Sequence, residues 1–104
     1  MSRCRSCQPV AQEVRVAADL LERRWLIQVV VAAHAGALRF NEFGSSVVGI
    51  SPRMLASRLR DLERAGLIER VVIPDSPPGV EYRLTARGEA LGPLVQALRR
   101  YAAA

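Results

Sequence analysis

Two cysteines and one histidine are the residues of this sequence best suited to metal or redox chemistry. Cys4 and Cys7 have the Cys-x-x-Cys spacing of half a zinc site or of a dithiol switch. One chain lacks the other two ligands, because His34 falls within an apolar segment and is expected to be a helix-end or hydrogen-bonded core residue. Two chains could pool four cysteines if their N-termini meet. We favour the simpler interpretation, in which ordinary reduced thiols lie in a mobile arm over residues 1–8.

No pattern in the sequence is typical of an enzyme. The sequence has no Ser/His/Asp set, no glycine-rich loop that could cradle a phosphate, and no complete set of metal ligands. Glu63 and Glu81 have arginine neighbours, so structural ion pairs are expected there rather than acid-base chemistry. We therefore predict a protein that is not an enzyme and that binds no cofactor and no metal.

The cationic side chains are all arginines. Fifteen arginines stand against ten acidic residues, which gives a formal net charge of +5. The planar guanidinium suits phosphates and guanine edges, whereas a lysine offers only a point charge. This balance predicts a polyanionic partner, although composition alone does not separate DNA from RNA or from an acidic protein. Five aromatic residues are too few for a single-strand stacking platform, and four of them are expected in the core: Trp25, Phe40, Phe43 and Tyr82.

The length and hydropathy of the chain predict one globular domain over residues 1–104. The longest apolar run, residues 25–38, is interrupted by polar residues and a glycine. It is shorter than the roughly 20 residues that a bilayer requires. We therefore expect a cytoplasmic protein without membrane contact.

Apolar periodicity predicts two helices near the N-terminus. Residues 9–21 form the first, and its apolar stripe has spacings of three and four: Val10, Val14, Ala17, Leu20 and Leu21. Residues 23–35 are apolar nearly all round, which favours a buried helix that ends at Gly36. A short strand over 38–40 and a brief helix with Asn41 as its N-cap are expected next.

Ser51-Pro52 is a strong helix start, because a capping hydroxyl precedes a proline at the first helical position. That helix is expected to reach Ala65. Segments 68–73 and 80–84 alternate like strands, and a Pro-rich tip between them predicts a hairpin. Thr85 then caps a last helix over 85–101, kinked near Pro93, whose apolar stripe comprises Leu91, Leu94, Val95 and Leu98.

The helix after Ser51 has an arginine-rich face opposite its leucines. With about 100° per residue, Leu55, Leu59 and Leu62 share one narrow stripe, and the residues directly opposite are Arg53, Ser57, Arg60 and Arg64. Four arginines against Asp61 and Glu63 leave only +2, so a solvated charged face is the plain alternative. The basic hairpin that follows favours DNA binding, and the candidate residues are Arg39, Asn41, Ser51, Pro52, Arg53, Met54, Ser57, Arg58, Arg60, Arg64, Arg70 and Arg83. Of these, Ser51, Arg53, Met54 and Ser57 are the base-edge candidates, and Arg58, Arg60 and Arg64 are the phosphate candidates.

The order of these motifs resembles the HxlR family of winged-helix regulators. The resemblance covers roughly residues 16–101 and rests on RFNEF at 39–43, GISPRML at 49–55, RLRDLE at 58–63, GLIER at 66–70 and PPGVEYRLT at 77–85, continuing to Gly88. This family consists of small bacterial homodimeric transcriptional regulators, often repressors, and some members sense oxidants through cysteine. Alignment on Trp25 puts Gln12 where such a cysteine is common, and Gly79 stands where the wing often carries an arginine.

The resemblance implies a mainly α (α+β) winged helix-turn-helix fold. It has about five helices, a two-stranded wing and a short third strand. A homodimer would bind a palindromic duplex operator, with helices 9–21 and 85–101 forming the interface through Val10, Val14, Ala17, Leu21, Leu91, Leu94, Val95 and Leu98. Two alternatives remain open: a winged-helix module that docks an acidic protein, and a thiol- or metal-sensing regulator that uses Cys4 and Cys7.

Overall fold

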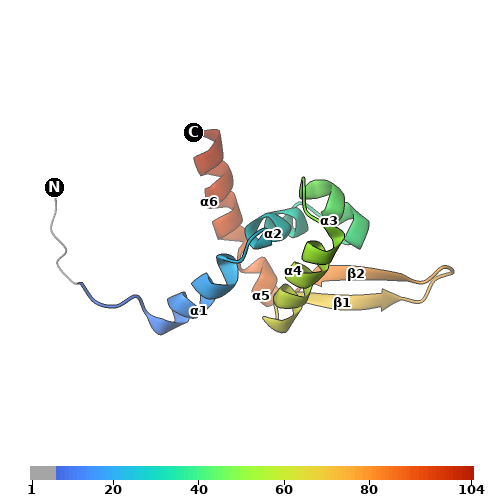
Figure 1. The fold of residues 1–104 in the computed structure, drawn as a ribbon, viewed down its shortest axis with the longest axis horizontal. Helices are drawn as coiled ribbons and strands as arrows, with labels where there is room; N and C mark the ends of the chain where they lie inside the picture. The colour runs from blue at the N-terminus through green and yellow to red at the C-terminus, as the bar shows by residue number, and fades with distance from the viewer. Residues whose placement is uncertain (1–6) are drawn as a thin grey trace.

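The computed structural model describes residues 7–104 and contains six helices and one hairpin in that range (Figure 1). In chain order the elements are α1 (Gln12–Leu21), α2 (Leu26–His34), α3 (Phe40–Ser46), α4 (Pro52–Arg64), β1 (Ile68–Ile73), β2 (Gly79–Leu84), α5 (Ala86–Glu89) and α6 (Gly92–Ala103). The hairpin projects from the body beyond α4, and α1 reaches out on the opposite side. This is the winged helix-turn-helix arrangement that the sequence predicts.

Helix α4 begins where the sequence indicates. The Ser51 hydroxyl accepts a hydrogen bond from the Met54 backbone N–H at 3.0 Å, and Pro52 occupies the first turn, where its missing N–H costs nothing. Leu55, Leu59 and Leu62 are each 1% exposed and contact the core formed around α2 and Phe43 of α3. The leucine stripe therefore fixes which face of α4 remains in solvent.

Helix α2 is the central core helix, and it starts later than expected, at Leu26 rather than Arg23. Trp25 precedes it with a left-handed φ of 74°, and its ring packs against the core as predicted. The guanidinium of Arg24 lies 5.1 Å from the centre of that ring, a cation–π contact. At the other end of the helix, Gly36 has a φ of 108°, which is the left-handed geometry expected of a glycine that closes a helix.

The sheet has two strands within the described residues, so the predicted third strand is wrong. β1 and β2 are antiparallel, with Ile68 opposite Leu84 and Ile73 opposite Gly79. Leu38 makes a single strand-like contact, in which its carbonyl oxygen accepts from the Tyr82 N–H at 2.7 Å. Helix α3 begins immediately afterwards with Arg39 as its N-cap, which places Asn41 inside the helix rather than at its cap.

The predicted last helix is divided into α5 and α6. Thr85 caps α5 as expected, because its hydroxyl accepts from the Gly88 N–H at 3.1 Å. Pro93 lies in the first turn of α6 and starts that helix rather than kinking a longer one. Gly88 is buried so closely against β1 that a Cβ there would lie 2.0 Å from the Leu67 carbonyl oxygen.

Replacing Gly88 with alanine should destabilise the fold. The added methyl group meets backbone rather than a movable side chain, so α5 must shift away from β1. We expect Gly88→Ala to lower the free energy of unfolding by about 1–3 kcal/mol, measured by urea denaturation. Gly92→Ala is the matched control, because the nearest atom to its Cβ would be His34 Cε1 at 3.8 Å, an ordinary contact. Equal stabilities for the two variants would contradict the close approach.

Candidate nucleic-acid interface

The solvent face of α4 carries most of the predicted DNA-binding residues. Arg53, Arg60 and Arg64 are exposed on the side away from the leucine stripe, and Ser57 is half-buried among them. At the start of the helix, Ser51 and Pro52 are exposed, and Met54 is half-buried beside them. The N-terminal end of α4 thus presents polar and cationic side chains to solvent.

Arg58 differs from the other arginines of α4, because its guanidinium is held inside the protein. Its side chain is only 16% exposed, and it forms an ion pair with Asp61 one turn further along the helix. Its second terminal nitrogen donates to the Met54 sulfur at 3.3 Å. Asp61, 9% exposed, also pairs with Arg23 at 2.8 Å. The Arg58 guanidinium is therefore engaged within α4, and Asp61 is the residue that ties α4 to Arg23 in the segment before α2.

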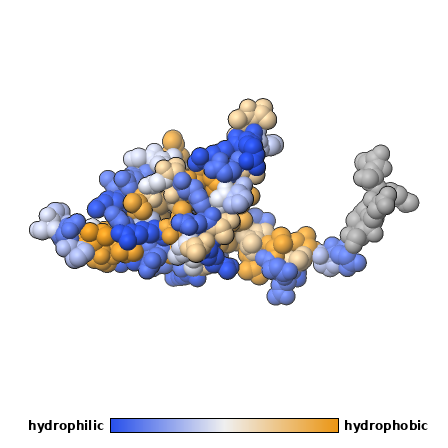
Figure 2. Space-filling model, turned by 180° about the vertical axis from the view of Figure 1, so that it is seen from behind, coloured by the Kyte–Doolittle hydropathy of each residue, from blue (hydrophilic) through white to orange (hydrophobic). Residues whose placement is uncertain are grey.

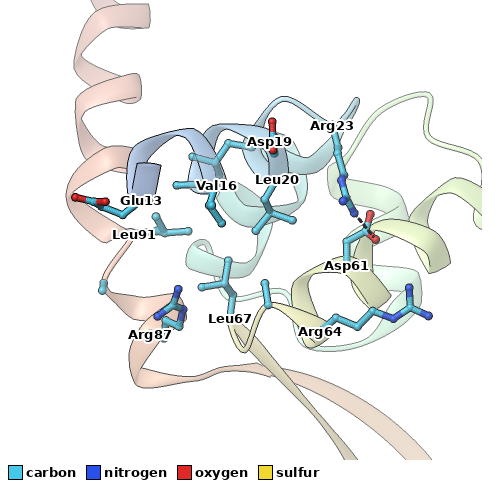
Figure 3. Close-up of a pocket in the computed structure, with 14 residues that line it drawn as sticks. Glu13, Val16, Asp19, Leu20, Arg23, Asp61, Arg64, Leu67, Arg87 and Leu91 are labelled. Carbon is cyan, nitrogen blue, oxygen red and sulfur yellow. Dashed lines mark ion pairs between the residues drawn. The ribbon is translucent and has the colours of Figure 1, made fainter. Parts of the chain in front are cut away.

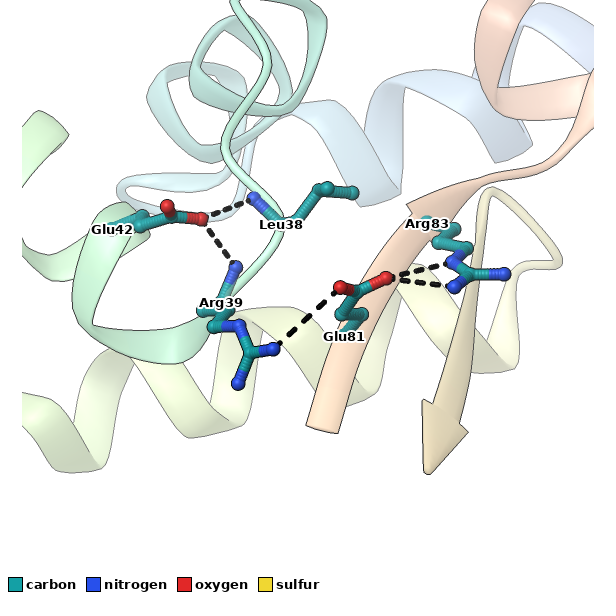
Figure 4. Close-up of polar contacts among 5 residues, drawn as sticks. All are labelled: Leu38, Arg39, Glu42, Glu81 and Arg83. Carbon is teal, nitrogen blue, oxygen red and sulfur yellow. Dashed lines mark hydrogen bonds and ion pairs between the residues drawn. The ribbon is translucent and has the colours of Figure 1, made fainter. Parts of the chain in front are cut away.

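The wing carries a second group of arginines around one carboxylate (Figure 4). Glu81 Oε1 accepts from Arg83 Nε at 3.0 Å and from Arg83 Nη2 at 2.8 Å, while Glu81 Oε2 lies 3.8 Å from Arg39 Nη2. The expected ion pairing of Glu81 is confirmed. Arg70, on the opposite strand, is exposed, and no ion pair is recorded for it within residues 7–104.

Glu42 fixes the entrance to α3 and thereby the position of Arg39. One of its carboxylate oxygens accepts from the backbone N–H of Arg39 at 2.8 Å and from that of Leu38 at 2.9 Å (Figure 4). These two hydrogen bonds stabilise the charged form and lower the pKa of Glu42 below its usual value. Asn41 is exposed on the first turn of the same helix.

The predicted dimer residues lie mostly on the surface. Val14 and Ala17 are exposed along α1, Val10 is exposed just before it, and Figure 2 shows apolar atoms gathered over this helix. Leu21, at the end of α1, is half-buried; on the C-terminal side, Leu94 is exposed, and Leu91 and Leu98 are half-buried. Val95 differs, because it is 1% exposed and already packs in the core of its own chain. It therefore offers no surface to a partner.

A groove lies between α1 and the far end of α4 (Figure 3). Its volume is about 740 Å³; its floor includes Leu20, Leu67 and Leu91, and its rim carries Arg64 and Arg87. The volume is in the range of small-molecule sites. The groove also includes Ala17 and Leu21, so it is continuous with the apolar face of α1 described above.

The remaining candidates for chemistry are distributed singly. His34, the last residue of α2, donates from Nε2 to the Gly88 carbonyl oxygen at 3.1 Å, which confirms it as a hydrogen-bonded helix-end residue. Cys7 is disulfide-bonded rather than a reduced thiol, and Cys4 lies outside the described residues. Over residues 7–104, no three histidine, cysteine or acidic side chains gather as a metal site would require. In the same range, no helix is long and apolar enough to cross a bilayer.

A capped helix with an arginine face, followed by a two-stranded wing, defines a winged helix-turn-helix protein. The chain belongs to the HxlR-like helix-turn-helix family, which it matches over residues 20–104. It is thus a transcriptional regulator of the helix-turn-helix type, as its relatives are. It is 37% identical over 86 residues to the Bacillus subtilis regulator YvaP, covering 83% of this chain and 80% of that one. A regulator from Methanothermobacter thermautotrophicus is 41% identical over 85 residues, which are 82% of this chain but 65% of the relative.

Solved structures show the same fold. The reduced form of the transcriptional regulator YodB from Bacillus subtilis superposes with a TM-score of 0.79 at 34% identity, covering 90% of this chain and 92% of that one. The redox regulator HypR in its oxidised form gives a TM-score of 0.76 at 36% identity, covering 86% of this chain and 92% of that one.

Removing the Asp61 carboxylate should destabilise the domain. Asp61→Ala leaves Arg58 without its charged partner in a largely buried position, so we expect a loss of about 1.5–3 kcal/mol in the free energy of unfolding. Glu63→Ala, on the exposed face of the same helix, is the control and should change stability by less than about 0.5 kcal/mol. Chemical denaturation of both variants measures this. An Asp61→Ala variant as stable as the wild-type protein would show that these ion pairs contribute nothing to the free energy of unfolding.

Proposed function

We propose that this chain is a sequence-specific DNA-binding regulator, acting as a repressor, that binds a palindromic operator as a homodimer. The observation that carries the proposal is the face of α4, where Arg53, Arg60 and Arg64 stand in solvent opposite three leucines that are almost completely buried. A rigid helix that presents guanidinium groups on one side matches the major groove in width and in charge.

The wing extends this basic face beyond the helix. Arg70 and Arg83 lie on the two strands that follow α4, and both are exposed. In the proposed complex these arginines contact phosphates beside the groove that α4 enters. Phosphate contacts fix the register of the protein on the duplex, while side chains at the start of α4 read the bases.

The homodimer is supported by apolar surface that the single chain leaves uncovered. Val10, Val14 and Val16 are each more than half exposed on or beside α1, and Leu94 and Tyr101 are exposed on α6. A partner that buries both helices would place two copies of α4 side by side. Half-sites on the operator would then be separated by about 34 Å or a multiple of it.

The division of labour on α4 can be tested with two substitutions. Arg53→Ala, near the start of the helix, should weaken operator binding about ten- to hundredfold while changing non-specific binding less. Arg64→Ala, at the far end, should weaken binding to both kinds of duplex alike and make the salt slope shallower by about 0.9. Titrations against DNA from upstream of the gene and against scrambled duplex measure both effects. Equal losses in the two variants would contradict the assignment of roles.

The same titration separates the proposal from a protein-docking module. A regulator should prefer its operator over scrambled DNA by about a thousandfold or more at physiological salt. A winged-helix module that docks an acidic protein would instead bind short duplexes weakly at low salt and without preference. The exposed Ser51 and Arg53 at the start of α4 favour the regulator, because docking an acidic protein needs charge but no capped helix that reads bases.

A second candidate function adds thiol sensing to the same regulator. It is favoured by the disulfide at Cys7 and by the likeness to the redox regulator HypR. In this case reduction of the disulfide at Cys7 should change operator affinity and re-oxidation should restore it, whereas a Cys7→Ser variant should keep the same affinity with and without oxidant. Thiol titration measures the state of the cysteines, and DNA binding under the same conditions measures operator affinity. Unchanged operator affinity on oxidation of the wild-type protein would reject sensing through these cysteines.

A further inference from the structure

The tip of the wing has no cationic side chain of its own. Residues 74–78, which connect the two strands, contain three prolines, one serine and one aspartate. On the strands themselves, Arg70 and Arg83 are set back from the tip, since the register pairs Arg70 with Tyr82 and Arg83 with Glu69. The tip of such a wing would therefore approach a DNA backbone without a positive charge from its own residues.

An arginine from another element occupies the place of a wing side chain. A Cβ built on Gly79, the first residue of β2, would lie 2.4 Å from Arg39 Nη1 and 3.2 Å from Arg39 Cζ. The guanidinium of Arg39 therefore lies against the bare backbone of the strand where it leaves the tip. Gly79 does not have a left-handed φ, so the missing side chain matters here for space and not for backbone freedom.

The path of Arg39 is fixed at both ends. Its neighbour Leu38 is hydrogen-bonded to the free edge of β2 at Tyr82, and its own backbone N–H donates to Glu42. From there the side chain extends towards Glu81, as Figure 4 shows. Its guanidinium also lies against Gly79, two residues nearer the tip on the same strand.

The cation of Arg39 remains available for a ligand. Its nearest recorded carboxylate oxygen, in Glu81, is 3.8 Å away, which is too far for a hydrogen bond. Glu81 instead accepts its two hydrogen bonds, at 2.8 and 3.0 Å, from Arg83. The Arg39 side chain is also 47% exposed. Its donors are thus oriented by the wing without being saturated by it.

We infer that Arg39 is a further phosphate contact at the wing, the one nearest its tip, and that Gly79 leaves the space for its guanidinium while Glu81 aligns it. The inference rests on the proposed function and assigns a position within it: the DNA backbone phosphate next to the groove that α4 enters. An arginine fork pre-oriented in this way contacts a phosphate with two parallel hydrogen bonds at little entropic cost.

The test compares operator affinity and its salt dependence for Arg39→Gln, Gly79→Ala and the double variant. Arg39→Gln should lower affinity about tenfold and make the salt slope shallower by about 0.9. Gly79→Ala keeps the charge but displaces the guanidinium, so it should lower affinity by several-fold. The double variant should bind no more weakly than Arg39→Gln alone, because both changes remove the same contact.

Two further variants serve as control and rescue. Arg87→Gln, on α5 at the other end of the wing, makes the same change of charge and should leave affinity within about twofold. Gly79→Arg in the Arg39→Gln background puts an arginine on the strand itself, in the vacated space, and should restore most of the affinity and the salt slope. Melting temperatures of all variants establish that they are folded, which is expected because every altered side chain is at the surface or at Gly79.

The possible failures are distinguishable. If the wild-type protein binds its operator and Arg39→Gln binds it equally tightly with the same salt slope, this inference is overturned and the proposed function stands. Additive losses for Arg39→Gln and Gly79→Ala would overturn the role of Gly79 as the seat of the guanidinium. A wild-type protein without affinity for any duplex would overturn the proposed function, and the inference with it.

Discussion

The burial of the leucine stripe of α4 is the constraint on which the rest of the interface depends. Burying Leu55, Leu59 and Leu62 almost completely contributes about 1.5–3 kcal/mol for each side chain. A rotation of the helix by one residue, about 100°, would expose these leucines and bring arginines to the core. The core therefore determines the direction of the arginine face, and no contact with DNA is required to orient it. Asp61 adds a polar tie by holding Arg58 and Arg23 at the margin of the same core.

Local signals predicted the elements that local chemistry determines. Ser51-Pro52, Thr85 and Gly36 mark helix ends through contacts within a few residues, and all three have that role in the structure. Predictions failed where contacts distant in the sequence decide. Asn41 has a better intrinsic capping side chain than Arg39. The helix nevertheless starts earlier, because the backbone hydrogen bond between Leu38 and Tyr82 and the hydrogen bonds that Glu42 accepts fix the chain just before it. The bond at Leu38 is also all that remains of the predicted third strand, because the chain turns into α3 immediately.

The candidate site shows the same division. The spacing of about 100° per residue that predicts Arg53, Arg60 and Arg64 in solvent also places Arg58 about 60° from the direction of Leu55. Arg58 therefore lies on the side of Leu62 and not opposite the core. That position gives a signal for a structural arginine, and the aspartate three residues later strengthens it, since i,i+3 pairs are neighbours on a helix. The arrangement of Arg39, Gly79 and Glu81 has no such signal. Forty residues separate the arginine from the glycine, and only the folded edge of β2 brings them together.

The two ends of the described chain have a different energetic status from its centre. α1 contains no buried residue, although its valines and leucines would gain by leaving water, and α6 anchors itself through Val95 while leaving Leu94 and Tyr101 outside. Exposed apolar helices of this kind are costly unless another surface covers them. In the proposed homodimer a second copy of the chain would cover them symmetrically, and the same symmetry would then fix the separation of the two recognition helices. Because α1 would hold the partner and α4 would hold the operator in that dimer, the packing of α1 against the body of the chain would set the spacing of the half-sites.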